Sequence, residues 1–389
     1  MHNSEQVESK IDSAGLIDEL CSIVSSDSVL FEKEDLKPYE CDGLSAYRAI
    51  PIVVVLPETI EQVQKVLGLC HLYHVPVVAR GAGTGLSGGA LPHEQGVLLS
   101  LAKFKNILEI NPERRIARVQ PGVRNLAISE AADHFGLYYA PDPSSQIACT
   151  IGGNVAENSG GVHCLKYGLT VHNIQQIKII TIEGEILTIG GSGLDSAGYD
   201  LLALMTGSEG MLGVIVEVTV KLLPKPERAQ VLLAAFDDVV KAGEAVGNII
   251  AAGIIPAGLE MMDRLAISAA EDFVHAGYPL DAEAILLCEL DGTNEEVSEH
   301  VLKVRDVFKT AALQKCAPRK MKTSGSLSGK DAKPHSLPWA DCHPIITAWM
   351  APYRASNYPK YWNPSLPYPK SMSCRLRMFF TPATVTCTR

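Results

Sequence analysis

Arg80-Gly81-Ala82-Gly83-Thr84-Gly85-Leu86-Ser87-Gly88-Gly89-Ala90 is the segment from which the rest of this sequence is best read. It follows Val75-Pro76-Val77-Val78-Ala79, a short apolar run that is typical of a buried strand. Because glycine has no Cβ, a loop of this composition can bring backbone N–H groups close to a ligand. Such groups form a concave site for an anion, often a phosphate. The segment therefore predicts a phosphorylated cofactor.

Two other interpretations of this segment have to be weighed. Residues 83–88 match the G-x-G-x-x-G pattern of nucleotide-binding βαβ units, which requires a helix directly after the glycines. Residues 90–96 instead predict a turn before a strand, which disfavours a nicotinamide dinucleotide site. A glycine turn without a ligand is the other alternative, but one turn rarely needs five glycines.

Two further glycine-rich patches occur later in the chain. Residues 141–161 contain Pro141-Asp142-Pro143-Ser144-Ser145 and two Gly-Gly pairs with Asn and Ser between them. The third patch, residues 207–213, reads Gly-Ser-Glu-Gly-Met-Leu-Gly. We expect the stretch 141–171 to be irregular, and a long irregular stretch is more typical of a functional loop than of a connector. One phosphate does not need three such patches, whereas a long dinucleotide held along its length would.

The composition excludes several classes of protein. The 389 residues are 47% hydrophobic and carry a net charge of −10, which disfavours nucleic acid as a partner. No apolar run is long enough to predict a membrane span, and the polar start of the chain does not resemble a signal peptide. We therefore expect a cytoplasmic location. The ten cysteines form no CxxC pair and are expected to stay reduced.

Hydrophobic periodicity predicts two successive regions that mix helices and strands. In the first region, helices are predicted over 11–24, 57–70 and 125–135, and strands over 50–56, 75–79, 96–101, 107–110, 116–120, 174–182, 185–189 and 214–223. Pro224-Lys225-Pro226 marks the clearest boundary. Beyond it, strands at 229–236, 258–262 and 284–290 alternate with helices at 239–252, 265–275 and 295–312. This order predicts a separate α+β layer.

The three glycine-rich patches carry a family resemblance. VVARGAGTGLSGG (77–89), PDPSSQIACTIGGNVAENSGGVHCLKYG (141–168) and LMTGSEGMLG (204–213) resemble the FAD-linked oxidases of the vanillyl-alcohol oxidase/p-cresol methylhydroxylase (PCMH) fold. Within that family the sequence is most similar to the flavin-bearing D subunits of bacterial glycolate oxidases, which PYECDGLSAYR (38–48) and AGLEMMDRLAI (257–267) also resemble. The resemblance covers residues 15–316.

This resemblance implies an α+β fold and a division of the chain. We expect an N-terminal helical segment over 1–48 and a PCMH-type, two-lobed FAD-binding domain over 49–226. A truncated α+β substrate or cap domain, a partial FAD-linked oxidase C-terminal domain, is expected over 227–316.

The resemblance also implies which residues hold FAD. The first patch would wrap the pyrophosphate, the second would line the isoalloxazine and ribityl side, and the third would hold the adenine side. The implied residues are Arg80, Gly81, Ala82, Gly83, Thr84, Gly85, Ser87, Gly88, Pro141, Asp142, Ser145, Gly152, Gly153, Asn154, Asn158, Gly160, Gly161, Tyr167, Gly168, Glu209, Gly210 and Ile215. Attachment is expected to be non-covalent, although His163 and Cys164 are the residue types that can form a flavin link.

The implied reaction is the oxidation of glycolate or a similar 2-hydroxy acid. A base removes the hydroxyl proton, hydride passes to the flavin, and the electrons leave to partner subunits rather than to NAD. The implied partners are a second flavin-domain subunit and an iron–sulfur subunit. A position at the periphery of the cytoplasmic membrane is the alternative to a purely cytoplasmic one. A D-lactate dehydrogenase is the alternative within the family.

The resemblance ends where the composition changes. Residues 317–389 carry eleven Lys and Arg against two Asp, hence a net charge of +9, whereas the first 316 residues carry −19. All three tryptophans and ten of the 23 prolines also lie in this tail. Disorder is one explanation, since such shifts in composition often mark disordered extensions.

A shifted reading frame is the explanation that we favour. Codons for MFFTPATVTCTR (378–389), read one base out of frame, can spell VFHAGDGNMHP, and those for DCHPIITAWM (341–350) can spell LSPDYYCMDG. Both strings resemble the glycolate oxidase subunits. The tail would then lack the family's substrate arginine and its HxGDGNxH metal segment, so no catalytic or metal-binding residue is predicted. A non-enzymatic chain that at most binds FAD is therefore the alternative from another class.

Overall fold

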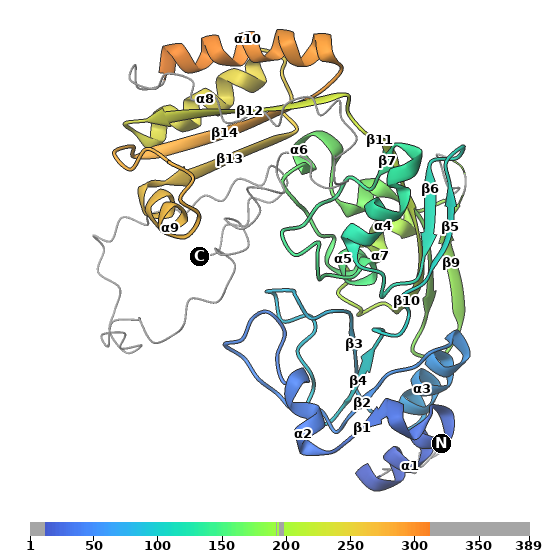
Figure 1. Ribbon diagram of the computed structural model, residues 1–389. Coiled ribbons are helices and arrows are strands. Elements are labelled where there is room, and N and C mark those ends of the chain that lie inside the picture. Colours follow the sequence, from blue (N-terminus) through green and yellow to red (C-terminus); the bar gives the residue numbers. More distant parts are fainter. Residues whose placement is uncertain (1–11, 192, 194–197, 312–389) are drawn as a thin grey trace, which may run out of the picture. The chain divides into compact units, whose positions relative to one another are not determined.

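The computed structural model describes residues 12–191, 193 and 198–311 (Figure 1). The chain divides into two compact units: unit 1 comprises Met1–Gly161 and Tyr167–Lys225, and unit 2 comprises Val162–Lys166 and Pro226–Arg389. Both units combine helices with β-sheets, so the fold class is α+β, as predicted. The predicted tail, 317–389, lies outside the described residues.

The first lobe of unit 1 contains a four-stranded sheet of order β1-β2-β4-β3. Its strands are β1 (Val29–Leu30), β2 (Val53–Val55), β3 (Val77–Arg80) and β4 (Val97–Ser100). Its helices are α1 (Ser13–Ile23), η1 (Ser26–Ser28), α2 (Lys33–Leu36), η2 (Lys37–Tyr39) and α3 (Ile60–Leu72). The strands β2, β4 and β3 run parallel, because α3 provides the crossover between β2 and β3.

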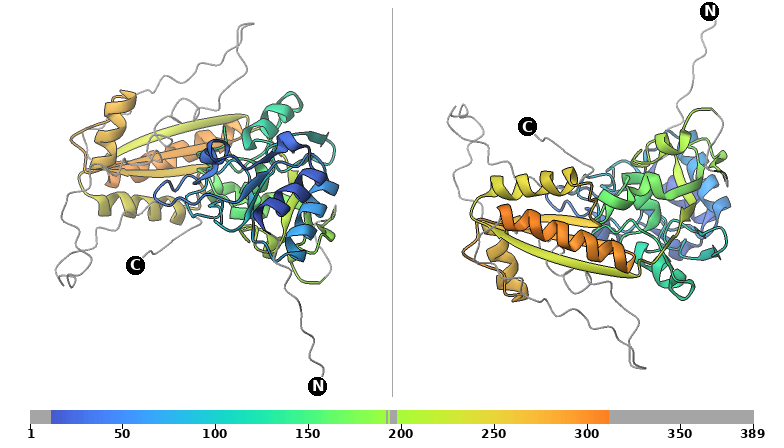
Figure 2. Two further views of the ribbon diagram at one scale, coloured as in Figure 1. Left: turned by 90° about the horizontal axis from the view of Figure 1, so that it is seen from below. Right: turned by 90° about the horizontal axis from the view of Figure 1, so that it is seen from above.

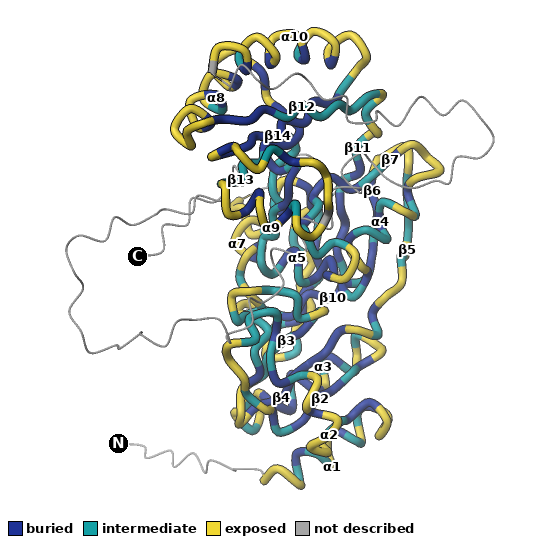
Figure 3. The backbone as a smooth tube through the Cα atoms, turned by 60° about the vertical axis from the view of Figure 1, so that its left-hand side comes forward, coloured by how far each residue is buried: buried dark blue, intermediate teal, exposed yellow. Residues whose placement is uncertain are grey.

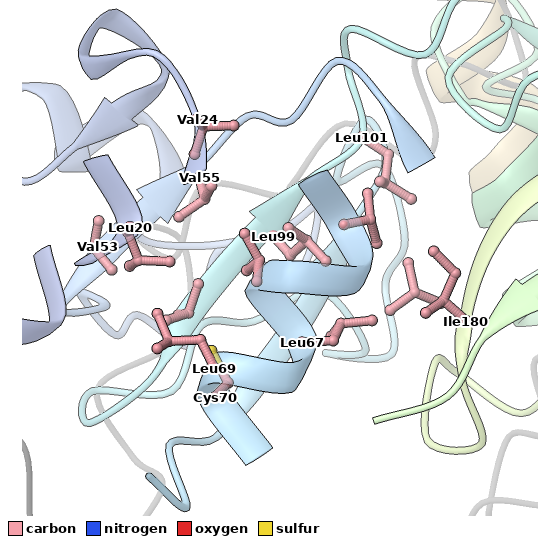
Figure 4. Close-up of a cluster of buried hydrophobic side chains, with 14 of the residues drawn as sticks. Leu20, Val24, Val53, Val55, Leu67, Leu69, Cys70, Leu99, Leu101 and Ile180 are labelled. Atoms are coloured by element: carbon pink, nitrogen blue, oxygen red, sulfur yellow. The ribbon is translucent and has the colours of Figure 1, made fainter. Parts of the chain in front are cut away.

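Helix α3 shows how the sequence specifies this lobe. Thr59 caps its first turn: Gln62 N donates to Thr59 Oγ1 at 3.2 Å, and Thr59 N donates to Gln62 Oε1 at 3.3 Å. Its apolar face buries Leu67 and Cys70 against the sheet (Figure 4). Ile180, from the second lobe, packs into the same core, so the two lobes of unit 1 share a hydrophobic cluster.

The second lobe contains a five-stranded antiparallel sheet of order β5-β6-β10-β8-β9. Its strands are β5 (Ile107–Asn111), β6 (Ile116–Val119), β8 (Ile174–Ile180), β9 (Ile186–Gly190) and β10 (Val214–Lys221), with a separate pair, β7 (Leu137–Tyr138) and β11 (Leu223–Pro224). Its helices are α4 (Asn125–Ala132), η3 (Asp133–Phe135), α5 (Ile151–Glu157), η4 (Thr170–Asn173) and α7 (Leu201–Met205). Helices α4 and α5 cover the sheet through one hydrophobic cluster.

The stretch 141–171 is less irregular than we expected. It contains α5 and α6 (Cys164–Tyr167). Ile151 and Val155, one turn apart on α5, are fully buried, and Asn158 ends the helix in the left-handed conformation. The irregular stretch was predicted because Gly152 and Gly153 are poor helix formers. The prediction was wrong for α5 because the burial of its apolar residues outweighs that preference.

From Pro226 to Ala311, unit 2 forms an antiparallel sheet of order β12-β14-β13 that is packed between helices. Its elements are β12 (Arg228–Phe236), α8 (Val239–Ala251), β13 (Gly258–Asp263), α9 (Arg264–Val274), β14 (Ala284–Gly292) and α10 (Asn294–Ala311). Helices α8 and α10 pack on one face and α9 on the other (Figures 1 and 2). The central strand β14 is buried almost throughout, whereas the outer side of α10 is exposed (Figure 3).

No helix in the described part of the chain is long and apolar enough to cross a membrane.

Candidate functional site

A cavity of about 190 Å³ lies within unit 1, between its two lobes. The first lobe contributes the end of β3 and the glycine-rich loop after it. The second lobe contributes α5, the loop before it and the loop that precedes β10. All three glycine-rich patches of the sequence therefore reach one cavity, although at least 45 residues separate each from the next.

The glycine-rich loop leaves its backbone donors available. Within the described residues, the N–H groups of Gly81 through Gly85, which line the cavity, donate to no other protein group. Buried or half-buried N–H groups normally have a partner, because leaving one unpaired is unfavourable. A row of free donors on a cavity wall is what an anion such as a diphosphate requires.

Thr150 provides a second unpaired group in the same wall. Its Oγ1 is buried and has no hydrogen-bond partner in the part of the chain that the structure describes, and it does not cap α5, the helix that begins at the next residue. A Cβ at Gly81 would fall on this oxygen, so glycine is required there for close approach. The hydroxyl and the loop donors together form a polar lining that the protein does not satisfy by itself.

Arg80 lines the cavity but its guanidinium is used internally. Its Nη1 donates to the carbonyl oxygens of Cys41 at 2.9 Å and Ala90 at 3.2 Å, and the group lies 5.7 Å from the Tyr39 ring centroid. Burial lowers the pKa of Arg80, and the charge of Asp42 opposes that shift. Arg80 therefore fixes the two ends of the glycine-rich loop against residues 39–42.

Asn154 is also engaged within the protein. Asn125 Nδ2 donates to Asn154 Oδ1 at 3.0 Å, and Asn154 Nδ2 donates to Ser159 Oγ at 3.3 Å. Asn154 lies against the buried Cys149, whose pKa is raised by burial. These contacts hold α5 in place beside the cavity.

The predicted FAD residues fall into two groups. Those that line the cavity are Arg80, Gly81, Ala82, Gly83, Thr84, Gly85, Ser145, Gly152, Gly153, Asn154, Glu209, Gly210 and Ile215. Those outside its lining are Ser87, Gly88, Pro141, Asp142, Asn158, Gly160, Gly161, Tyr167 and Gly168. In the second group, Asn158 Oδ1 accepts from Val171 N at 3.0 Å, and the Tyr167 carbonyl accepts from Asn173 Nδ2 at 2.9 Å.

The sequence reasoning missed several residues of the lining. Those with polar or reactive side chains are Cys149, Thr150, Glu157 and Ser159. Gly89 and Gly213 lie within the quoted motifs and could have been found there. Leu101 and Pro121 carry no such signal, because only the topology brings the ends of β4 and β6 to the cavity.

The sequence matches two protein families. Residues 51–190 match the FAD binding domain, and residues 225–324 match the C-terminal domain of FAD linked oxidases. The glycolate oxidase subunit GlcD of Escherichia coli is 69% identical over 280 residues, which cover 72% of this chain and 56% of the relative. The Bacillus subtilis subunit of the same name is 42% identical, covering 70% of this chain and 58% of the relative.

A D-lactate dehydrogenase of Anaerostipes hadrus is more distant, at 35% identity over 71% of this chain and 59% of its own length. The chain thus spans little more than half the length of these curated relatives.

Solved structures show the same fold. A structure of p-cresol methylhydroxylase matches with a TM-score of 0.65 and 22% identity, covering 76% of this chain and 64% of the other. An alkyldihydroxyacetonephosphate synthase matches with a TM-score of 0.67 and 21% identity, covering 78% of this chain and 60% of the other. At this level of identity the likeness concerns the fold, which is the PCMH-type fold that the sequence predicted.

Proposed function

Because the chain belongs to the FAD-linked oxidase family, we propose that unit 1 binds FAD non-covalently in the cavity between its lobes. The observation that carries this proposal is the row of N–H groups from Gly81 to Gly85, which have no acceptor among the described residues and suit the diphosphate. Thr150 Oγ1 supplies a further hydrogen-bonding group in the same wall. FAD, when bound, would supply the hydride acceptor.

The surroundings of His163 and Cys164 support non-covalent binding. Both residues belong to unit 2 and neither lines the cavity. His163 Nε2 lies 3.4 Å from Glu289 Oε2, and Cys164 is 5% exposed. Groups engaged in this way are poorly available for a bond to the flavin.

By relationship, the reaction of the whole protein is the oxidation of glycolate to glyoxylate. The relatives named as glycolate oxidase subunits are 69% and 42% identical, against 35% for the D-lactate dehydrogenase, so glycolate is the preferred substrate and D-lactate the alternative. Their description as subunits supports electron transfer to partner subunits, for which we propose a second flavin-domain subunit and an iron–sulfur subunit.

For this particular chain we propose FAD binding without turnover. The sequence likeness covers little more than half of each relative. If the reading frame is shifted as we propose, this chain lacks the segments expected to hold the substrate arginine and the metal. A peripheral position at the cytoplasmic membrane stays part of the proposal.

Flavin spectroscopy tests both parts of this proposal. The purified chain is mixed with FAD, and unbound FAD is then removed. The protein should show the spectrum of bound flavin, and acid precipitation should release that flavin into solution. Anaerobic glycolate should leave that spectrum unchanged. A protein without bound flavin would contradict the cofactor assignment. Rapid bleaching of the flavin absorbance by glycolate but not by D-lactate would contradict the proposed lack of turnover and support glycolate as the substrate.

A further inference from the structure

Two carboxylates converge on the loop whose N–H groups are free for an anion. Ser87 Oγ donates to Glu157 Oε2 at 2.9 Å and so joins the loop to the end of α5. A Cβ placed on Gly89 would lie 2.6 Å from Glu157 Oε1 and 3.7 Å from Glu209 Oε2. Acidic groups therefore share the cavity wall with the proposed diphosphate site, although negative charges repel each other.

Asp42 adds a third carboxylate below the same loop. It is 6% exposed; its Oδ1 accepts from Leu44 N at 2.8 Å, and its buried Oδ2 has no hydrogen-bond partner among residues 12–191, 193 and 198–311. Its neighbour Gly43 packs directly beneath the carbonyl oxygens of Thr84 and Gly85. Asp42, Glu157 and Glu209 form what we call the carboxylate cluster.

The surroundings of Glu157 favour its protonated form. Burial raises the pKa of Glu157 most strongly, the Ser87 hydrogen bond opposes this, and the charges of Glu209 and Asp42 raise it further. In the described part of the chain no lysine or arginine pairs with Glu157. Asp42, in contrast, interacts with the Arg80 guanidinium, and Glu209 is exposed to solvent.

We propose that Glu157 takes up one proton from solvent when the FAD diphosphate enters the cavity, so that cofactor and proton bind together. This inference rests on the proposed FAD function. The diphosphate stays ionised at neutral pH, so its arrival disfavours the ionised form of a neighbouring carboxylate. A proton on Oε1 would remove the repulsion, while Oε2 keeps the hydrogen bond from Ser87.

The sign of the pH dependence follows from this proton uptake. Bound FAD raises the pKa of Glu157 above its value in the free protein, so FAD affinity rises as the pH falls through the interval between the two values. With one linked proton, the dissociation constant changes by at most about tenfold per pH unit.

Calorimetry with the full chain measures the linkage directly. FAD is titrated at one pH in two phosphate-free buffers of different ionisation enthalpy, and the difference in heat gives the protons taken up per FAD. We expect net uptake in the parent chain and no uptake in Glu157→Gln, whose FAD affinity should no longer depend on pH. Glu113→Gln, on an exposed turn away from the cavity, should match the parent.

A second variant tests the same proton uptake if the Glu157→Gln chain does not fold. Ser87→Ala removes the hydrogen bond that favours the ionised carboxylate, so the interval of proton uptake should move to higher pH. FAD binding without proton uptake in the parent, or equal uptake in Glu157→Gln, would overturn the inference but leave the FAD site intact. Absence of FAD binding in the parent would overturn the proposed function and this inference together.

Discussion

Unit 1 and unit 2 bury polar groups in opposite ways. In unit 1 the cavity wall contains the N–H groups of Gly81 through Gly85 and the Thr150 hydroxyl, none of which has a hydrogen-bond partner among the described residues. In unit 2 the buried carboxylate of Asp291 lies 2.5 Å from Lys166 Nζ, and that of Glu289 lies near His163. An unpaired buried polar group costs about 1–3 kcal/mol, so unit 1 has most to gain from a ligand.

This difference suggests that the polar groups of the unit 1 cavity are arranged for a ligand, whereas the buried charged groups of unit 2 are paired within the protein. Binding of FAD to the folded state would stabilise unit 1 by mass action. In unit 2 the buried carboxylate of Asp291 is paired with Lys166, which belongs to the short segment Val162–Lys166 that the chain inserts from between two parts of unit 1. Mutations should therefore affect cofactor binding in one unit and stability in the other.

The largest expected effect is on FAD binding. In Gly81→Val the new side chain would occupy the position of Thr150 Oγ1 and narrow the cavity, so affinity for FAD should fall by at least about a thousandfold, with overpacking costing unit 1 about 1–3 kcal/mol. Gly68→Val is the matched control, because nothing lies within 4 Å of a Cβ there. Flavin content after gel filtration measures both; equal flavin content would contradict the cavity as the binding site.

The next effect is confined to unit 2. Replacing Lys166 by Met leaves the carboxylate of Asp291, which is 5% exposed, without its cation, and should destabilise unit 2 by about 3 kcal/mol. Hydrogen exchange of β12–β14 peptides would report the loss, whereas FAD binding should persist. Lys303→Met breaks an exposed pair with Glu299 and should change stability by less than about 1 kcal/mol. Equal losses of stability in both variants would mean that the buried pair stabilises the fold no more than the exposed pair.

A third effect compares the units in one experiment. Burial raises the pKa of Cys70 in unit 1 and of Cys288 in unit 2 to about 12, so both thiols stay protonated at neutral pH and react only when their unit opens. FAD at about 100 times its dissociation constant should slow labelling of Cys70 by up to about a hundredfold and leave Cys288 unchanged. Riboflavin, which lacks the diphosphate, is the control and should protect much less. Equal protection of both thiols by FAD would remove the distinction between the units.

The difference between the two units could be predicted from the sequence only in part. The three glycine-rich patches are visible without a structure because only glycine permits such close backbone approach, and they meet at one cavity. Arg80 stays a predicted cofactor residue, but the sequence did not predict that its guanidinium donates to the carbonyl oxygen of Cys41, some 40 residues earlier in the chain. Long-range partners of this kind have no local signal. The same applies to Thr150, whose importance depends on Gly81 lying opposite.

The smallest expected effect gives the sharpest test, because it has opposite signs for stability and binding. Thr150→Val keeps the shape of the side chain but removes a buried hydroxyl without a partner, so the FAD-free protein should become more stable by about 1 kcal/mol. If that hydroxyl serves the cofactor, FAD affinity should fall by at least about tenfold, because a hydrogen bond to a charged group contributes about 1.5–3 kcal/mol. Thr206→Val is the control: Thr206 Oγ1 donates to Leu202 O at 2.7 Å, so its loss should reduce stability and leave FAD affinity unchanged. Denaturant unfolding without FAD and fluorescence titration with FAD measure the two quantities. A Thr150→Val chain that loses stability and keeps its FAD affinity would show that the hydroxyl is structural and that the cavity wall is not organised around a ligand at this point.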